Sequence, residues 1–110
     1  MIVPASVLAA IRQPAFVYRR EGTVEAANDL AVDWAGGPLA GMTPADVIAR
    51  LSIRRRDGTP LLPDELPVVR ALRGEEVVDL PLAAATADGR TVYVLATASP
   101  IRHGDAIAGA

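Results

Sequence analysis

The single histidine of this chain is the first residue to consider for chemistry. His103 stands in the sequence HGD, which is typical of a turn, and the tip of a turn projects away from a pocket. A hydrolase would combine it with Ser52 or Ser99 and an aspartate, but neither serine lies in a nucleophile-elbow pattern. A metal site would need further ligands, and the chain has no second histidine and no cysteine. We therefore expect His103 to be a solvated turn residue.

Two groups of charged side chains could act on or bind a ligand. Glu75 and Glu76 could work as paired carboxylates, although their position after Gly74 favours a solvated entry into a strand. The arginine run 54–56 could bind a phosphate or a carboxylate. Three arginines in a loop without an aromatic neighbour more often form a solvated or partner-pairing surface. Both roles of the arginine run stay open.

An apolar pocket is the third possibility. Trp34 and Tyr18 each combine an apolar ring with a polar atom, which is how an apolar pocket orients a small ligand. Core packing is the simpler role for Trp34. Ala26 and Ala96 leave volume in the interior, and the domain carries a pocket if larger neighbours do not fill it.

Composition excludes several classes of protein. The 110 residues suffice for one domain, and no apolar run approaches the ~20 residues of a membrane helix. No basic residue precedes the first apolar run, so we expect no secretory signal, a cytoplasmic location and no membrane partner. The absence of cysteine excludes disulfides, thiolate metal sites and a cysteine-linked flavin. The net charge of -2, with both signs interleaved, indicates no nucleic-acid partner.

The elements that must position these residues follow from periodicity and turn residues. Helices are expected over residues 5–11, 28–36, 43–51 and 64–73. Strands are expected over residues 15–19, 23–27, 76–86, 90–102 and 106–110. Asn28 fits the N-cap of the second helix, and Thr43, Pro44 and Asp46 come close to a capping box at the third. Helices between two runs of strands indicate an α+β domain, in which helices cover one face of an antiparallel sheet.

The order and spacing of three segments resemble those of a PAS domain. These are VEAAN at 24–28, RDGTPLLPDELPVVRALRGE at 56–75 and DGRTVYVLATASPIRHGDAIAGA at 88–110. The resemblance covers roughly residues 7–110, so we expect 1–110 to be a single PAS-like domain. It implies a five-stranded antiparallel sheet in the order 2-1-5-4-3, with short helices on one face and an N-terminal helix. In this family the last strand continues into a connector to an output domain, so we expect the chain to stop within that strand and to lack its output domain.

The resemblance implies a regulatory sensor of a signalling protein, such as a bacterial two-component system or a phosphatase regulator, and not an enzyme. Two roles stay open: sensing of a small, mostly apolar ligand, or ligand-free dimerisation and protein interaction. A small stand-alone enzyme is a third possibility, which the lack of an inward His, Asp or Glu disfavours. Family members that ligate haem use a histidine on the helix equivalent to 64–73, which has none, so we expect neither haem nor a covalent flavin.

Strand alternation and the helix stripes assign side chains to the two faces of this sheet. The expected pocket residues are Phe16, Tyr18, Ala26, Trp34, Leu51, Val69, Leu72, Val94 and Ala96. Other strand residues expected to face the helices are Val24, Val78, Leu80, Leu82 and Val92. Val17, Tyr93 and Leu95 would point to the opposite face, which the N-terminal helix, a second copy of the chain, or both should then cover. We therefore expect a homodimer.

Overall fold

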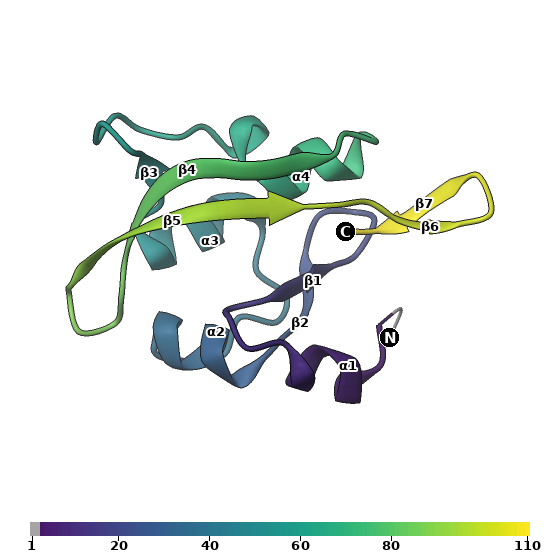
Figure 1. The fold of residues 1–110 in the computed structure, drawn as a ribbon, viewed down its shortest axis with the longest axis horizontal. Helices are drawn as coiled ribbons and strands as arrows, with labels where there is room; N and C mark the ends of the chain where they lie inside the picture. The colour runs from purple at the N-terminus through teal and green to yellow at the C-terminus, as the bar shows by residue number, and fades with distance from the viewer. Residues whose placement is uncertain (1–2) are drawn as a thin grey trace.

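The computed structural model describes residues 3–110 and confirms an α+β fold. The helices are α1 (Ala5–Ala10), α2 (Asp29–Ala35), α3 (Pro44–Leu51), the 3₁₀ helix η1 (Pro63–Glu65) and α4 (Pro67–Leu72). The strands are β1 (Phe16–Tyr18), β2 (Val24–Ala27), β3 (Arg54–Arg55), β4 (Val77–Ala85), β5 (Thr91–Ala98), β6 (Ile101–His103) and β7 (Ala106–Gly109) (Figure 1). Among the described residues, no helix has the length and hydropathy needed to span a membrane.

The described strands form three small antiparallel sheets and not one continuous five-stranded sheet. β1 pairs with β2, β4 lies between β3 and β5, and β6 pairs with β7. The strand expected over 90–102 is divided into β5 and β6 by Ser99 and Pro100. Proline has no N–H to donate to a strand ladder, which accounts for the interruption.

A short contact joins the first hairpin to the last. Arg19 forms an isolated antiparallel bridge with Gly109. Tyr18 and Ala110 exchange two backbone hydrogen bonds, of 2.7 and 3.1 Å between nitrogen and oxygen. The end of the chain therefore lies against β1, as Figure 1 shows.

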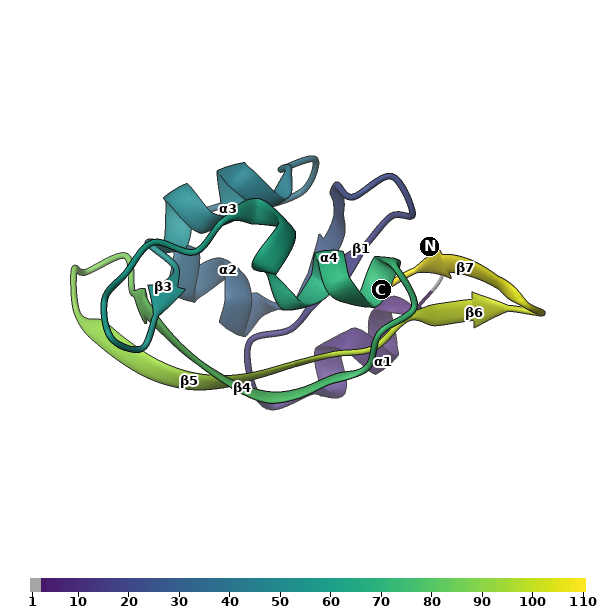
Figure 2. The ribbon, with the colours of Figure 1, turned by 90° about the horizontal axis from the view of Figure 1, so that it is seen from above.

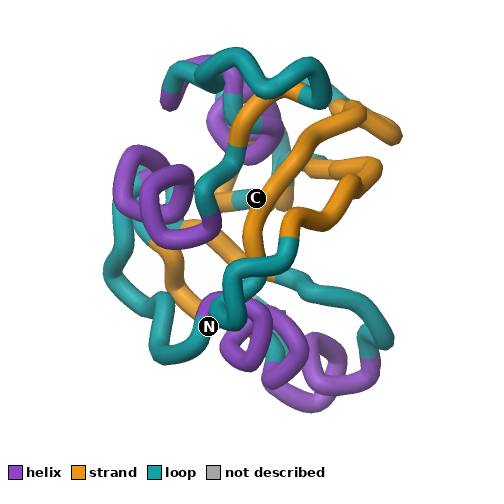
Figure 3. The backbone as a smooth tube through the Cα atoms, turned by 90° about the vertical axis from the view of Figure 1, so that its left-hand side faces the viewer, coloured by secondary structure: helices purple, strands orange, loops and turns teal. Residues whose placement is uncertain are grey.

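The core lies between the β4–β5 hairpin and the helices. Figure 2 shows α2, α3 and α4 on one side of this hairpin, and Figure 3 shows helices to the left of and below the strands at the upper right. Leu39, Leu51 and Val24 are the largest side chains that are completely buried. We define the core cluster as Tyr18, Val24, Ala31, Ala35, Leu39, Val47, Leu51, Leu61, Leu66, Val68 and Leu82.

The expected helix caps are confirmed. The Asn28 side chain accepts a hydrogen bond from the backbone N–H of Ala31 at 3.0 Å, which begins α2. Thr43 and Asp46 form a reciprocal capping box at the start of α3. Each cap satisfies backbone N–H groups that have no partner within their own helix, so local chemistry fixes where both helices begin.

The helix expected over 64–73 is wrong in its first half. Residues 63–65 form the 3₁₀ turn η1, and α4 begins only at Pro67. Leu66 between them is extended, with φ -63° and ψ 132°. Steric contact with a following proline disfavours the helical conformation, and the extended Leu66 separates η1 from α4.

The first hairpin contains an extra residue that changes which side chains face the core. Val17 lies opposite Ala26 whereas Tyr18 lies opposite Val24, which leaves Glu25 as the extra residue of β2. Directly opposite residues of antiparallel strands point to the same face. The prediction that Ala26 faces the core with Val24 is therefore wrong. Ala26 shares the face of Val17, and both lie on the side where α1 packs, which explains why Val17 is buried.

A second irregularity lies in β4. Val78 and Asp79 together occupy the space opposite the single residue Thr97 of β5. Asp79 adopts a positive φ of 53°, a conformation that aspartate tolerates better than most residues. Val78 is 68% exposed, so the prediction that it faces the helices is wrong. The bulge reverses the alternation on which that prediction depended.

Candidate functional site

Seven of the nine expected pocket residues come together, but they do so within the packed core. Tyr18 and Leu51 belong to the core cluster, with 3% and 1% of their surfaces exposed. Five more pack against this cluster while half-buried: Phe16, Trp34, Val69, Val94 and Ala96. Ala26 and Leu72 are not among the side chains packed there. The interior site expected from the sequence is thus occupied by the expected residues themselves.

Tyr18 is the buried polar side chain of this group. Its ring centroid lies 6.4 Å from that of Phe16, with the two rings tilted by 48°. Burial raises the pKa of the Tyr18 phenol well above its usual value, because the charged phenolate would lose its hydration. Tyr18 is therefore neutral at any physiological pH.

Trp34 lies in the last turn of α2, close to the turn between β4 and β5. Its backbone carbonyl accepts a hydrogen bond from the N–H of Ala87 at 2.9 Å. Gly36 then ends α2 with a φ of 78°. A Cβ atom on Gly36 would lie 2.8 Å from the Cβ of Ala87, so this approach requires glycine. These backbone contacts hold the end of α2 against the β4–β5 turn.

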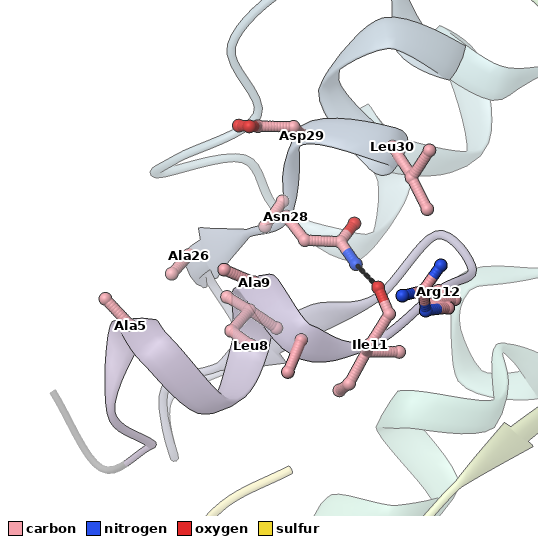
Figure 4. Close-up of a pocket in the computed structure, with 11 residues that line it drawn as sticks. Ala5, Leu8, Ala9, Ile11, Arg12, Ala26, Asn28, Asp29 and Leu30 are labelled. Carbon is pink, nitrogen blue, oxygen red and sulfur yellow. Dashed lines mark hydrogen bonds between the residues drawn. The ribbon is translucent and has the colours of Figure 1, made fainter.

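A hollow of about 690 Å³ lies between α1 and the start of α2 (Figure 4). Leu8, Ile11 and Leu30 supply much of its apolar lining, and the cation Arg12 lines it as well. Ala26, one of the expected pocket residues, also lines it. Asp29 also lines the hollow, but Figure 4 shows its carboxylate pointing away from Arg12, so an apolar wall and a cation are left to suit an amphipathic anion.

Asn28 forms the polar part of this hollow, and all of its hydrogen-bonding groups have partners. Its Nδ2 donates to the carbonyls of Ile11 and Gln13, at 3.2 and 2.8 Å. Its Oδ1 accepts from the N–H groups of Ala31 and Ala15, at 3.0 and 3.1 Å. An amide side chain has two donor hydrogens and two acceptor lone pairs, and all four are used. Asn28 therefore holds the segment after α1 against α2, and a ligand would have to displace one of these bonds.

A second hollow, of about 530 Å³, lies between α4 and β4, and its charged residues neutralise one another. Arg70 pairs with Glu75 at 3.3 Å, and Arg73 pairs with Asp64 at 3.4 Å. The third pair joins Arg55 to Glu65, whose pKa is lowered first by the backbone N–H of Leu62 and then by the arginine. With its arginines paired, this hollow offers no unbalanced charge to a ligand.

The arginine run divides between two surfaces. Arg55 turns to the paired charges just described and also donates to the carbonyl of Pro60 at 2.7 Å. Arg54 donates to the Thr91 Oγ1 at 3.3 Å. The Arg56 guanidinium carbon lies 5.6 Å from the ring centroid of Tyr93, within the range of a cation–π contact. Arg54 and Arg56 therefore lie beside the outer face of β5.

That outer face carries a group of exposed apolar side chains. Tyr93 and Leu95 of β5 are 63% and 60% exposed, and Val78 joins them because of the bulge in β4. Pro81, which lies directly opposite Leu95, is also exposed. We call these four residues the outer strip. Clustered exposed apolar side chains are typical of a surface that contacts another protein. Tyr93 and Leu95 follow from strand alternation, whereas Val78 does not, because the bulge leaves no sequence pattern.

The possible catalytic residues do not assemble. His103 is exposed at the end of β6, and no hydrogen bond among the described residues joins it to either serine. Ser99 instead donates to the Glu76 carboxylate at 2.6 Å. Glu75 pairs with Arg70, so the two glutamates have separate partners and do not form a carboxylate pair.

Comparisons with protein-family models, curated proteins and solved structures found no match to this chain. The function must therefore be argued from the geometry of its own residues.

Proposed function

We propose that the chain is a PAS-like, non-catalytic module that self-associates through the outer strip and regulates an output domain of a signalling protein. The observation that carries this proposal is the exposure of Val78, Tyr93 and Leu95, each at least 60% exposed, on the face of the hairpin opposite the helices. Burying these side chains against a second copy would remove apolar surface from water, at roughly 25 cal/mol per Å².

The strand contacts support the PAS-like order of the sheet. β2 pairs with β1, and β1 meets the end of β7 through the bridge and the two hydrogen bonds described above. β7 pairs with β6, which follows β5 after two residues, and β5 pairs with β4. These contacts support the order 2-1-5-4-3, which we propose for the five expected strands.

The packing of the interior favours self-association over sensing in the core. A ligand at the expected interior site would have to displace Tyr18 or Leu51, both of which are buried in the core cluster. Protein interiors are packed as densely as organic crystals, so such a displacement would be costly.

Sedimentation equilibrium tests this proposal by comparing Leu95→Gln with Leu62→Gln. Leu62 is a matched control, because it is 62% exposed and lies outside the outer strip. Loss of an apolar side chain at the centre of an interface is expected to weaken self-association about tenfold or more. Leu62→Gln should leave it unchanged. A wild-type chain that stays monomeric at millimolar concentration would refute the proposal, as would equal association of the two variants.

A second candidate function is the sensing of a small amphipathic anion in the hollow beside α1, which Leu8, Ile11 and Arg12 favour. Native mass spectrometry of the purified domain, followed by denaturation, tests it by detecting a bound mass that leaves on unfolding. Ile11→Trp should narrow the hollow and reduce this mass. An absorbance scan of the same sample tests the expectation that neither haem nor flavin is bound.

A further inference from the structure

Charged groups are arranged in order along the outer face of β5. At the beginning of the strand, Arg54 donates to the side chain of Thr91 and Arg56 lies over the ring of Tyr93. Among the described residues, Arg56 forms no ion pair. The outer strip is therefore bordered at this end by positive charge.

The opposite end of the same face is acidic. The backbone N–H of Asp79 donates to the Oγ1 of Thr97 at 3.2 Å, which brings the bulge onto the face of that threonine. Beyond it, Ser99 donates to the carboxylate of Glu76. Both acidic residues are exposed. The bulge that exposes Val78 therefore also brings Asp79 to this end of the strip.

The two charged ends are far enough apart to give the strip a direction. Arg56 lies at Tyr93 and Asp79 lies at Thr97, four positions further along β5, which corresponds to about 14 Å in an extended strand. This distance exceeds the ~8 Å over which salt screens exposed charges at physiological ionic strength. Each end therefore interacts with whatever group of a partner lies directly against it.

We propose that the outer strip binds a second copy of this chain in antiparallel orientation, so that Arg56 faces Asp79 of the partner subunit. This inference rests on the proposed function and adds the geometry of the pair. A two-fold axis through the middle of the strip places each basic end against an acidic end, twice over. The parallel orientation would bring the two Arg56 side chains together and is disfavoured by their repulsion.

Association through the edge of β4 is the competing arrangement, and the sequence of that strand opposes it. Beyond the two residues paired with β3, the free part of β4 contains Pro81 and the bulge at Val78 and Asp79. Proline and bulges are the features by which edge strands avoid pairing with another chain. The face of the hairpin is thus a better contact surface than the free edge of β4.

The experiment measures the dissociation constants of Arg56→Glu, of Asp79→Arg and of their equimolar mixture by sedimentation equilibrium in low salt. Each variant alone places like charges together at both contacts of the pair, and should bind itself roughly tenfold or more weakly than the wild-type chain. In the mixture, a dimer with one chain of each variant places opposite charges together at both contacts. The mixture should therefore associate as tightly as the wild-type chain. Glu76→Arg serves as a second charge reversal at the acidic end of the strip, because the positive φ of residue 79 disfavours an arginine at that position.

The outcomes separate this inference from the proposed function. If the mixture associates no more tightly than either variant alone while Leu95→Gln still weakens association, the strip is the interface but the antiparallel orientation is wrong. If neither the charge variants nor Leu95→Gln alters association, the proposed function fails as well.

Discussion

Asn28 offers a sharp test of how this domain holds its N-terminal segment. Asn28→Ala removes four hydrogen bonds: the cap of α2 and three bonds to residues 11–15. An N-cap is worth about 1 kcal/mol, and each further bond contributes about 1 kcal/mol net. The expected loss is therefore about 4 kcal/mol, a large part of the 5–15 kcal/mol that stabilises a typical domain.

Asn28→Ser separates the two roles of this side chain. Serine is as good an N-cap as asparagine, but it is too short to bond to the segment at 11–15 as well. Asn28→Ser should lower the free energy of unfolding by about 3 kcal/mol. It should therefore be more stable than Asn28→Ala by about 1 kcal/mol, the contribution of the cap.

Urea unfolding measures both losses, and hydrogen exchange locates them. In Asn28→Ser, amides of residues 5–15 should exchange faster, while those of α3 should change only as far as the global stability does. A loss below about 1 kcal/mol for Asn28→Ser would refute the reasoning, because the three bonds to residues 11–15 would then contribute almost nothing.

Three further predictions concern the core and its turns. Gly36→Ala should lower the free energy of unfolding, measured in urea, by at least about 1 kcal/mol more than Gly41→Ala does. Both positions have positive φ, but only a Cβ at position 36 would meet another atom. Equal losses of stability would contradict this contact. Leu51→Ala should lose about 2–5 kcal/mol, and a smaller loss would show that the core around it can collapse. Burial raises the pKa of Tyr18 in the folded state, whereas in the unfolded chain this phenol loses its proton near pH 10. The neutral Tyr18 therefore contributes fully to the free energy of unfolding below about pH 10, and this contribution is lost as the pH rises further. Tyr18→Phe should remove that part of the decline, which unfolding measured between pH 9 and 11 would reveal.

Features that depend on neighbours in sequence could be predicted here. Asn28 and the Thr43 box were identified because a cap needs only its own helix's first turn. The break at Leu66 was also within reach, since the residue before a proline avoids the helical conformation. A helix that begins at residue 64 places Pro67 in its first turn, where a proline removes no hydrogen bond, but a proline fits the first helical position equally well and α4 begins there.

The face of the sheet to which a strand residue points could be predicted only where the two paired strands keep a regular register. Tyr93 and Leu95 are exposed on the outer face as alternation predicts. Ala26 and Val78 are not where it places them, because Glu25 and the Val78–Asp79 bulge each add a residue to one strand of a pair. An extra residue is defined by the strand opposite, so the pattern of a single strand does not reveal it.

The two bulges together explain why the expected pocket and the observed surface differ. The extra residue in β2 turns Ala26 away from the core cluster and toward α1. The bulge in β4 turns Val78 outward and brings Asp79 beside Thr97. The first change removes a small side chain from the interior, and the second adds an apolar group and an acid to the outer face. Both changes favour a filled core and an exposed contact surface, which is the combination expected of a module that works by association.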